Sequence, residues 1–261
     1  MARLLAIEGF SCLALSYFGG APLPRNLVEV PLDYVEQALH WLADHPSVAG
    51  LRLGVIGASK GAELALLAAT QMPDAVGAVV AYAPSAVSFA GIAFRGDGRH
   101  RSSWSLRERP LPFVPYPKGA RPSVGLRGIS LAPIYRAALD NAEAVAAAAI
   151  PVERAEASIM LISGGRDRMW PSSAMAEMLE ARLRANGGGD RVVHLRFPDA
   201  GHSFMPWAPA TFSGRSARVV DAVRLAGFGG LFDLGGKPRA NRTALREAWP
   251  RAIDFLRHHL T

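Results

Sequence analysis

The sequence is poor in cysteine and lysine, and it holds no apolar run long enough to cross a membrane. Its one cysteine, Cys12, excludes an internal disulfide and favours a reducing compartment. The apolar start of the chain differs from a signal peptide because Glu8 and Gly9 interrupt it, which favours a helix followed by a strand. We therefore expect a cytoplasmic protein without a membrane span.

Three kinds of binding motif are also missing. The sequence has no His, Cys, Asp or Glu cluster with metal-ligand spacing, no Gly-rich dinucleotide loop and no nucleic-acid-binding motif. We therefore expect no metal, no cofactor and no nucleic acid partner.

Positive charge is concentrated in one part of the chain. The stretch 85–136 carries a net charge of +7, which equals that of the whole protein. Such a patch attracts anions, and without a nucleic-acid motif a phosphate-bearing small molecule is the favoured partner. A solvated, arginine-rich surface loop is the alternative. The basic residues of this stretch are Arg95, Arg99, Arg101, Arg107, Arg109, Lys118, Arg121, Arg127 and Arg136.

The chain is organised around a Gly-x-Ser-x-Gly segment that follows a short apolar strand at 51–57 and precedes a helix from Lys60 to Gln71. In this context the pattern indicates a nucleophile elbow with Ser59 exposed on a strained turn. A side chain at Gly57 or Gly61 is expected to collide with the neighbouring strand or helix. The backbone N–H of Lys60 could then donate to a developing oxyanion.

Strands and helices alternate along the 261 residues, which predicts one α/β domain over 1–261 with a parallel sheet covered on both faces. Residues 85–133 are rich in Pro, Gly and Arg and predict an irregular insertion outside the sheet, within a cap over 85–150. The other expected helices are 2–7, 32–43, 135–149, 172–185 and 243–259, and the other expected strands are 11–17, 75–82, 158–163 and 192–197.

Two loops that follow strands offer partners for Ser59. Asp167 lies after the strand at 158–163, and His202 lies after the strand at 192–197. Carboxyl ends of parallel strands meet at one sheet edge, so these side chains are expected to gather there. In this arrangement His202 would accept the serine proton and Asp167 would orient the imidazole.

Each partner has a competitor. Asp199 is close to His202 in sequence but sits on the same loop, and Asp167 could instead cap the helix that starts near Pro171. His194 lies inside a strand, where we expect a packing or surface role. The remaining histidines show no loop-at-strand-end context: His40, His45, His100, His258 and His259.

Several segments spread along the chain carry a resemblance to a known family. They are Tyr17-Phe18-Gly19, Pro31–Ala38, Trp41-Leu42 with His45-Pro46, Gly54–Leu66, Gly164–Trp170, Gly201-His202, Gly235–Pro238 and Trp249 with Phe255-Leu256. Through these segments the chain resembles the catalytic domain of acyl-CoA thioesterases and bile acid-CoA:amino acid N-acyltransferases. The resemblance extends over nearly the whole chain, is loosest between Ser85 and Ala149, and implies an α/β-hydrolase fold with the triad Ser59, Asp167 and His202. Members that transfer acyl groups to amino acids use Cys at the nucleophile position, so Ser59 implies hydrolysis of acyl-CoA.

Substrate contacts are expected from aromatic and basic residues in these segments and in the basic stretch. They are Tyr17, Phe18, Trp170, Arg99, Arg101 and Arg107. The arginines could meet the phosphates of coenzyme A.

The chain departs from the resemblance in two ways. It lacks the family's fused N-terminal β-sandwich and the Gly-rich strand and loop that look like the source of the second oxyanion donor. We expect the strand at 11–17 to pair directly with the elbow strand or to leave a gap, and activity to be weak unless a loop such as 17–20 donates instead. A carboxylesterase or dienelactone-hydrolase-like enzyme, an acyl-CoA:amino acid N-acyltransferase and a non-catalytic truncated relic remain alternatives.

Overall fold

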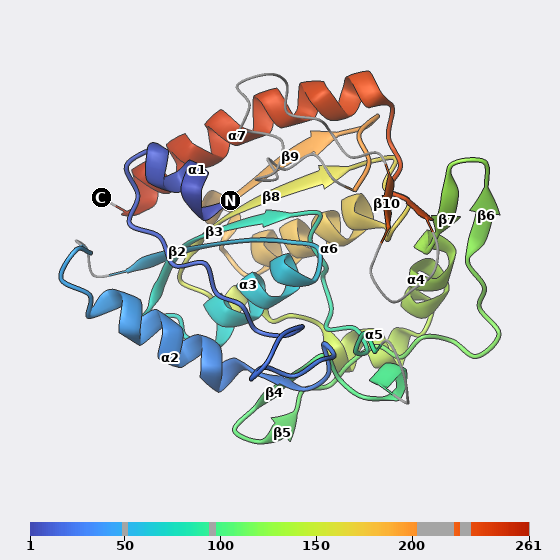
Figure 1. Ribbon diagram of the computed structural model, residues 1–261, viewed down its shortest axis with the longest axis horizontal. Helices are drawn as coiled ribbons and strands as arrows, with labels where there is room; N and C mark the ends of the chain where they lie inside the picture. The colour runs from blue at the N-terminus through green and yellow to red at the C-terminus, as the bar shows by residue number, and fades with distance from the viewer. Residues whose placement is uncertain (49–51, 94–97, 203–221, 225–230, 261) are drawn as a thin grey trace.

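A four-stranded parallel sheet forms the centre of the computed structural model, which describes residues 1–48, 52–93, 98–202, 222–224 and 231–260 (Figure 1). Its order is β2-β3-β8-β9, and all three neighbouring pairs are parallel. The α/β class and the parallel sheet are therefore confirmed. The strands are β2 (Leu53–Ala58), β3 (Val76–Tyr82), β8 (Ser158–Gly164) and β9 (Val192–Phe197).

Helices cover both faces of this sheet, as the alternation of elements predicts (Figure 1). Along β3, Val79 and Ala81 point to one face, whereas Ala78 and Val80 point to the other, because side chains alternate along a strand. The first face packs against α2 (Leu32–Ala43), α3 (Lys60–Gln71) and α6 (Ser172–Ala185), and the second against α1 (Ala2–Ile7) and α7 (Pro238–Leu260).

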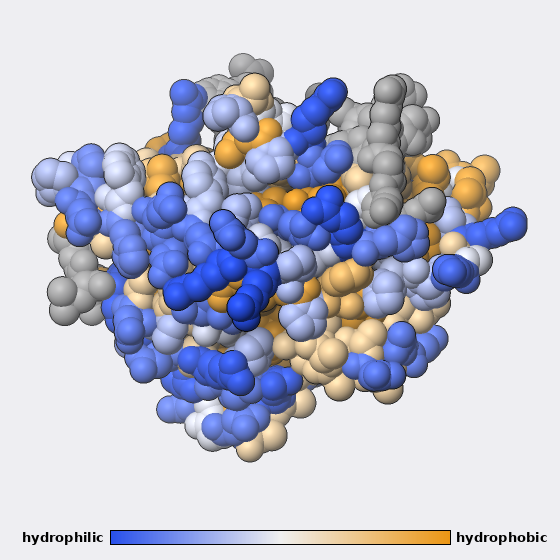
Figure 2. Space-filling view, turned by 90° about the horizontal axis from the view of Figure 1, so that it is seen from below, coloured by the Kyte–Doolittle hydropathy of each residue, from blue (hydrophilic) through white to orange (hydrophobic). Residues whose placement is uncertain are grey.

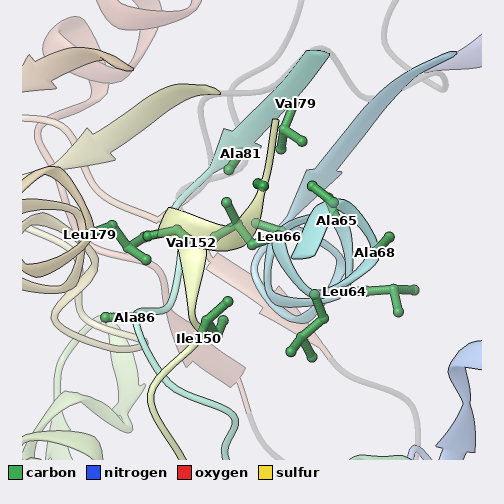
Figure 3. Close-up of a cluster of buried hydrophobic side chains, with 14 of the residues drawn as sticks. Leu64, Ala65, Leu66, Ala68, Val79, Ala81, Ala86, Ile150, Val152 and Leu179 are labelled. Atoms are coloured by element: carbon green, nitrogen blue, oxygen red, sulfur yellow. The ribbon is translucent and has the colours of Figure 1, made fainter. Parts of the chain in front are cut away.

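Helix α3 is the most deeply buried helix of the sheet's first face. Its residues from Ala62 to Thr70 are all buried. In Figure 3, Leu64 and Leu66 of α3 lie in the same apolar cluster as Val79 of β3 and Ile150. The residue types explain this burial, since Ala and Leu combine high helix propensity with apolar side chains.

The inserted segment (residues 85–150) is more ordered than the sequence predicts. It contributes to two small sheets, β1-β4-β5 and β10-β11-β7-β6, so the expectation of an irregular segment is wrong. In the described part of the chain none of its strands joins the central sheet. Its content of Pro, Gly and Arg suggests an irregular segment, but its side chains Phe89 and Trp104 are fully buried and belong to the main core. The strands are β1 (Val30–Pro31), β4 (Trp104–Leu106), β5 (Arg109–Pro110), β6 (Ser123–Gly125), β7 (Gly128–Ser130), β10 (Ala222–Arg224) and β11 (Leu231–Asp233).

The expected strand at 11–17 is not formed, which corrects the sequence analysis. In the described part of the chain, β2 pairs only with β3 and is an edge strand. Most of 11–17 is exposed, and Ser11 donates from its hydroxyl to the carbonyl of Ser47 at 2.8 Å. Apolar alternation alone does not make a strand where no neighbouring strand accepts its backbone hydrogen bonds.

Helix boundaries follow the predictions closely with two exceptions. The helix expected over 135–149 is divided at Asp140 into α4 (Ala132–Leu139) and α5 (Ala142–Ala148), because Asn141 caps α5 by accepting from the N–H of Ala144 at 3.1 Å. The last helix starts five residues early, at Pro238, a residue favoured in the first turn. Three 3₁₀ turns complete the described elements: η1 (Gly98–His100), η2 (Val152–Arg154) and η3 (Gly189–Arg191).

The surface fits the charged composition. Figure 2 shows a face that is largely hydrophilic, with apolar side chains between the charged ones. Among the residues that the structure describes, no helix is both long and apolar enough to span a membrane.

A buried ion pair joins the first turn of α3 to the inserted segment. The Nζ atom of Lys60 lies 2.8 and 2.9 Å from the two carboxylate oxygens of Glu63, and both side chains are almost fully buried. Glu63 also accepts from the indole N–H of Trp104 at 2.6 Å and from the backbone N–H of Phe89 at 3.1 Å. Burial raises the pKa of the Glu63 carboxyl and lowers that of the Lys60 amine, while their contact opposes both shifts.

Removing one partner of this pair should destabilise the fold. We expect Lys60→Met to lower the free energy of unfolding by about 3–5 kcal/mol, because it leaves a buried carboxylate without its cation. The double variant Lys60→Met/Glu63→Leu should recover part of that loss. Urea denaturation measures the effect, with Lys118→Met as the control because Lys118 is exposed. If Lys60→Met were as stable as Lys118→Met, this prediction would be contradicted.

Candidate active site

Ser59 lies on the sharp turn between β2 and α3 with a backbone φ of 56° and ψ of −125°. A positive φ is strained for a residue with a Cβ, and such strain occurs often at functional sites. The Ser59 N–H donates to the carbonyl of Tyr82 at 2.9 Å and so ties the turn to the end of β3. Lys60 begins α3, so its N–H has no acceptor within the helix.

The two glycines around Ser59 differ in importance. A Cβ at Gly57 would overlap with the backbone of Gly61, so the tight turn requires glycine at position 57. Among the described residues outside its own helix, a Cβ at Gly61 would come within 4 Å only of Tyr17, whose Oη would be 3.7 Å away, an ordinary contact distance. The expectation that a side chain at Gly61 collides is therefore wrong, because the helix leaves that side open.

Asp167 and His202 form a hydrogen-bonded pair. The Nδ1 atom of His202 lies 2.8 Å from the Oδ2 atom of Asp167. Asp167 is buried and also accepts from the Ser172 hydroxyl at 2.6 Å and from the N–H groups of Met169 and Trp170 at 2.8 and 3.1 Å. Asp167 therefore does bind the start of α6, but the same carboxylate also holds His202. The contribution of Ser172 was not predicted, although a serine directly after Pro171, at the start of a predicted helix, is a common hydrogen-bonding residue.

The loop that carries His202 is held by a glycine-rich turn before α7. The His202 N–H donates to the carbonyl of Leu234 at 2.7 Å, and the Gly201 N–H donates to Oδ1 of Asn241 at 2.8 Å. A Cβ at Gly201 would overlap with the backbone of Gly235, so the two loops approach as closely as backbones allow. Sequence reasoning did not find the role of Asn241, although the nearby segment 235–238 pointed to this region.

The strand register brings Ser59 to the same edge as the Asp167–His202 pair. Ala58 pairs with Tyr82, and Tyr82 pairs with Ile162, so β2, β3 and β8 end side by side. Trp170 connects the loops, because its indole N–H donates to the carbonyl of Ala83 at 3.2 Å and its ring centre lies 5.8 Å from that of His202. Ser59 and the Asp167–His202 pair therefore follow strands that end at the same edge of the sheet, and their joint role stays a prediction.

The competing residues have other partners. Asp199 accepts from Arg166 at 2.6 Å and from Lys237 at 3.3 Å on the surface of its loop. His194 is buried in β9, with Nε2 2.8 Å from the Ser163 hydroxyl and Nδ1 3.1 Å from Glu180. His194 therefore lies inside the fold, away from the Asp167–His202 pair, with polar partners at both ring nitrogens.

The expected substrate-binding residues lie in different environments. Tyr17 and Phe18 are half-buried against the main core, and Trp170 is buried next to His202. Arg101 forms a two-point ion pair with Glu29, and Arg107 is exposed at the tip of the β4–β5 hairpin. The side chain of Arg99 falls outside the described residues. The arginines therefore do not form one cluster in the described structure, and their contact with substrate stays a prediction.

A cleft of about 380 Å³ opens beside Asp167, where α4 faces the start of α6. Arg136 of α4 and Asp140, which caps its C-terminal end, line one side, and Gly165 and Pro171 line the other. In the described ranges, no group of three or more His, Cys, Asp or Glu side chains could hold a metal ion.

The fold and site define an α/β protein with a serine on a strained strand-to-helix turn and an Asp–His pair at the same sheet edge. A family model described as "BAAT / Acyl-CoA thioester hydrolase C terminal" matches residues 30–261, and the chain belongs to this family. The resemblance seen in the sequence is thereby confirmed.

Named relatives agree with that family. An acyl-coenzyme A amino acid N-acyltransferase 2 of Rattus norvegicus is 32% identical over 261 residues, and an acyl-coenzyme A thioesterase 6 of Mus musculus is 32% identical over 264 residues. Each match covers 99% of this chain and 56% of the relative, so the chain spans about half the length of these proteins. A putative dienelactone hydrolase from Klebsiella pneumoniae matches in structure with a TM-score of 0.44 and 15% identity, over 87% of this chain and 60% of that one.

The two glycines of the elbow should respond differently to alanine. We expect Gly57→Ala to lower the free energy of unfolding by about 1–3 kcal/mol or more, because the new methyl group overlaps with backbone. Gly61→Ala should leave stability unchanged or raise it by up to about 1 kcal/mol, because alanine favours the helix. Thermal or urea unfolding of both variants tests this, and a larger loss for Gly61→Ala would contradict the geometry.

Proposed function

We propose that this chain is a serine hydrolase of the α/β-hydrolase fold that cleaves acyl-CoA thioesters through an acyl-enzyme on Ser59. The observation that carries the proposal is the strained Ser59 turn at the sheet edge where His202 and Asp167 are paired at 2.8 Å. Membership of the acyl-CoA thioester hydrolase family supports the substrate class.

The proposed roles follow from the hydrogen bonds of the pair. The contact of Nδ1 with the Asp167 carboxylate assigns the ring proton of His202 to Nδ1, so Nε2 is the nitrogen that would accept the proton of the Ser59 hydroxyl. The serine oxygen attacks the thioester carbonyl, and the N–H of Lys60 donates to the oxygen that becomes negative. His202 returns the proton to the departing thiolate of coenzyme A, and water then cleaves the acyl-enzyme by the same route.

The choice of hydrolysis over amino acid transfer rests on Ser59 and on the resemblance, in which transferring members use Cys at this position. An anionic leaving group suits the basic stretch 85–136, and Arg136 lies on the cleft beside Asp167. The cytoplasmic location remains a prediction.

The proposed triad should behave as one unit. We expect Ser59→Ala, His202→Ala and Asp167→Asn each to lower kcat for decanoyl-CoA by orders of magnitude, and their combination to add little. Labelling by a fluorophosphonate probe should disappear in Ser59→Ala. Asp199→Asn is the matched control, because Asp199 is on the surface and pairs with Arg166 and Lys237. If Asp199→Asn is the damaging variant and Asp167→Asn stays active, the acid has been assigned to the wrong residue.

The leaving group should be recognised by charge. Decanoyl-CoA should have a lower KM than p-nitrophenyl decanoate, and this advantage should shrink as salt is added. Arg136→Ala should raise KM for decanoyl-CoA more than for the neutral ester, whereas Arg246→Ala, on the exposed side of α7, should change neither. Equal KM values without a salt effect would favour a general carboxylesterase, and formation of an acyl-glycine when glycine is added would favour an acyltransferase.

A further inference from the structure

Tyr17 lies next to the elbow although it comes from a distant part of the chain. Its Oη atom would be 3.7 Å from a Cβ on Gly61, which is two residues beyond Ser59 in the first turn of α3. Gly61 directly follows Lys60, and the amino end of α3 faces the proposed site of oxyanion formation, so the Tyr17 hydroxyl lies beside the first turn of the helix that would supply the Lys60 N–H.

The Tyr17 ring is held by aromatic contacts. Its centre lies 5.3 Å from that of Phe18 and 6.0 Å from that of Trp104. Trp104 is itself fixed, because its indole N–H donates to Glu63, which is paired with Lys60. A short chain of contacts therefore connects the ring of Tyr17 to the helix that follows Ser59.

The hydroxyl of Tyr17 is available to a ligand. Two other tyrosines use their hydroxyl groups within the protein, because the hydroxyl oxygens of Tyr116 and Tyr135 lie 3.2 Å apart. Within the described residues, by contrast, Tyr17 Oη has no hydrogen-bond partner. Burial, followed by the charge of Glu63, raises the pKa of Tyr17 to about 12, so the phenol stays protonated and can donate at neutral pH.

We propose that the Tyr17 hydroxyl donates a hydrogen bond to the carbonyl oxygen of a substrate bound at Ser59 and acts there together with the N–H of Lys60. This inference rests on the proposed function and names a further catalytic residue for it. The bond strengthens as the carbonyl oxygen becomes negative, so it lowers the barrier of the chemical step more than it favours substrate binding. No proton is transferred from Tyr17, and its O–H bond remains intact throughout.

The first test removes only the hydroxyl. We expect Tyr17→Phe to lower kcat for decanoyl-CoA by about 10²–10³-fold with little change in KM, as for loss of one oxyanion donor. Tyr34→Phe, which removes a hydroxyl from α2, is the matched control and should keep kcat. A raised KM with unchanged kcat, or no change at all, would overturn the proposal.

The second test does not depend on how well Tyr17→Phe folds. Replacing Tyr17 by a fluorinated tyrosine lowers the pH at which the phenol ionises, and the phenolate cannot donate. We expect kcat of this protein to fall as pH rises through the new phenol pKa, while the natural protein keeps its activity over the same range. An unchanged pH profile would refute the role of the hydroxyl.

Labelling by a fluorophosphonate separates failure of this inference from failure of the proposed function. If Ser59 is labelled and decanoyl-CoA is cleaved, but Tyr17→Phe has full kcat, only the role of Tyr17 is wrong. If the natural protein neither reacts with the probe nor cleaves decanoyl-CoA, the proposed function itself is wrong, and the inference is lost with it.

Discussion

The buried Lys60–Glu63 ion pair is the interaction on which the arrangement around Ser59 depends. Glu63 satisfies its charge with Lys60, with the indole of Trp104 and with the N–H of Phe89, so one carboxylate fixes three chain segments. In a low-dielectric interior each of these bonds is strong, and each is costly to leave unmade. The inserted segment is therefore joined to α3, the helix that follows Ser59, by hydrogen bonds to the Glu63 carboxylate as well as by apolar packing.

Close backbone approaches hold the other half of the site. Gly201 lies against Gly235, and Asn241 binds the N–H of Gly201, so the loop with His202 is fixed by the turn before α7. Asp167 is fixed in turn by the Ser172 hydroxyl at the start of α6. The proposed acid and base are thus carried by loops but positioned by the ends of two helices, which limits how far either side chain can move.

Much of the fold and the candidate site was predictable because the relevant signals are local. The periodicity of 60–71, 172–185 and 192–197 predicted elements whose bounds the structure reproduces. The same reasoning failed at 11–17, where alternation resembles a strand but β2 offers no pairing to it in the described structure. It also failed in the inserted segment, because Phe89 and Trp104 gain their burial from contacts with α3 that no local pattern encodes.

The sequence by itself determined the Gly-x-Ser-x-Gly turn, the order of Ser59, Asp167 and His202, and the parallel α/β class, since each follows from residue types at short spacing. Only the tertiary structure decided that Gly57 requires glycine while Gly61 does not, and that Lys60 is buried rather than solvated. The physical reason is that close approach and desolvation depend on segments far apart in the chain.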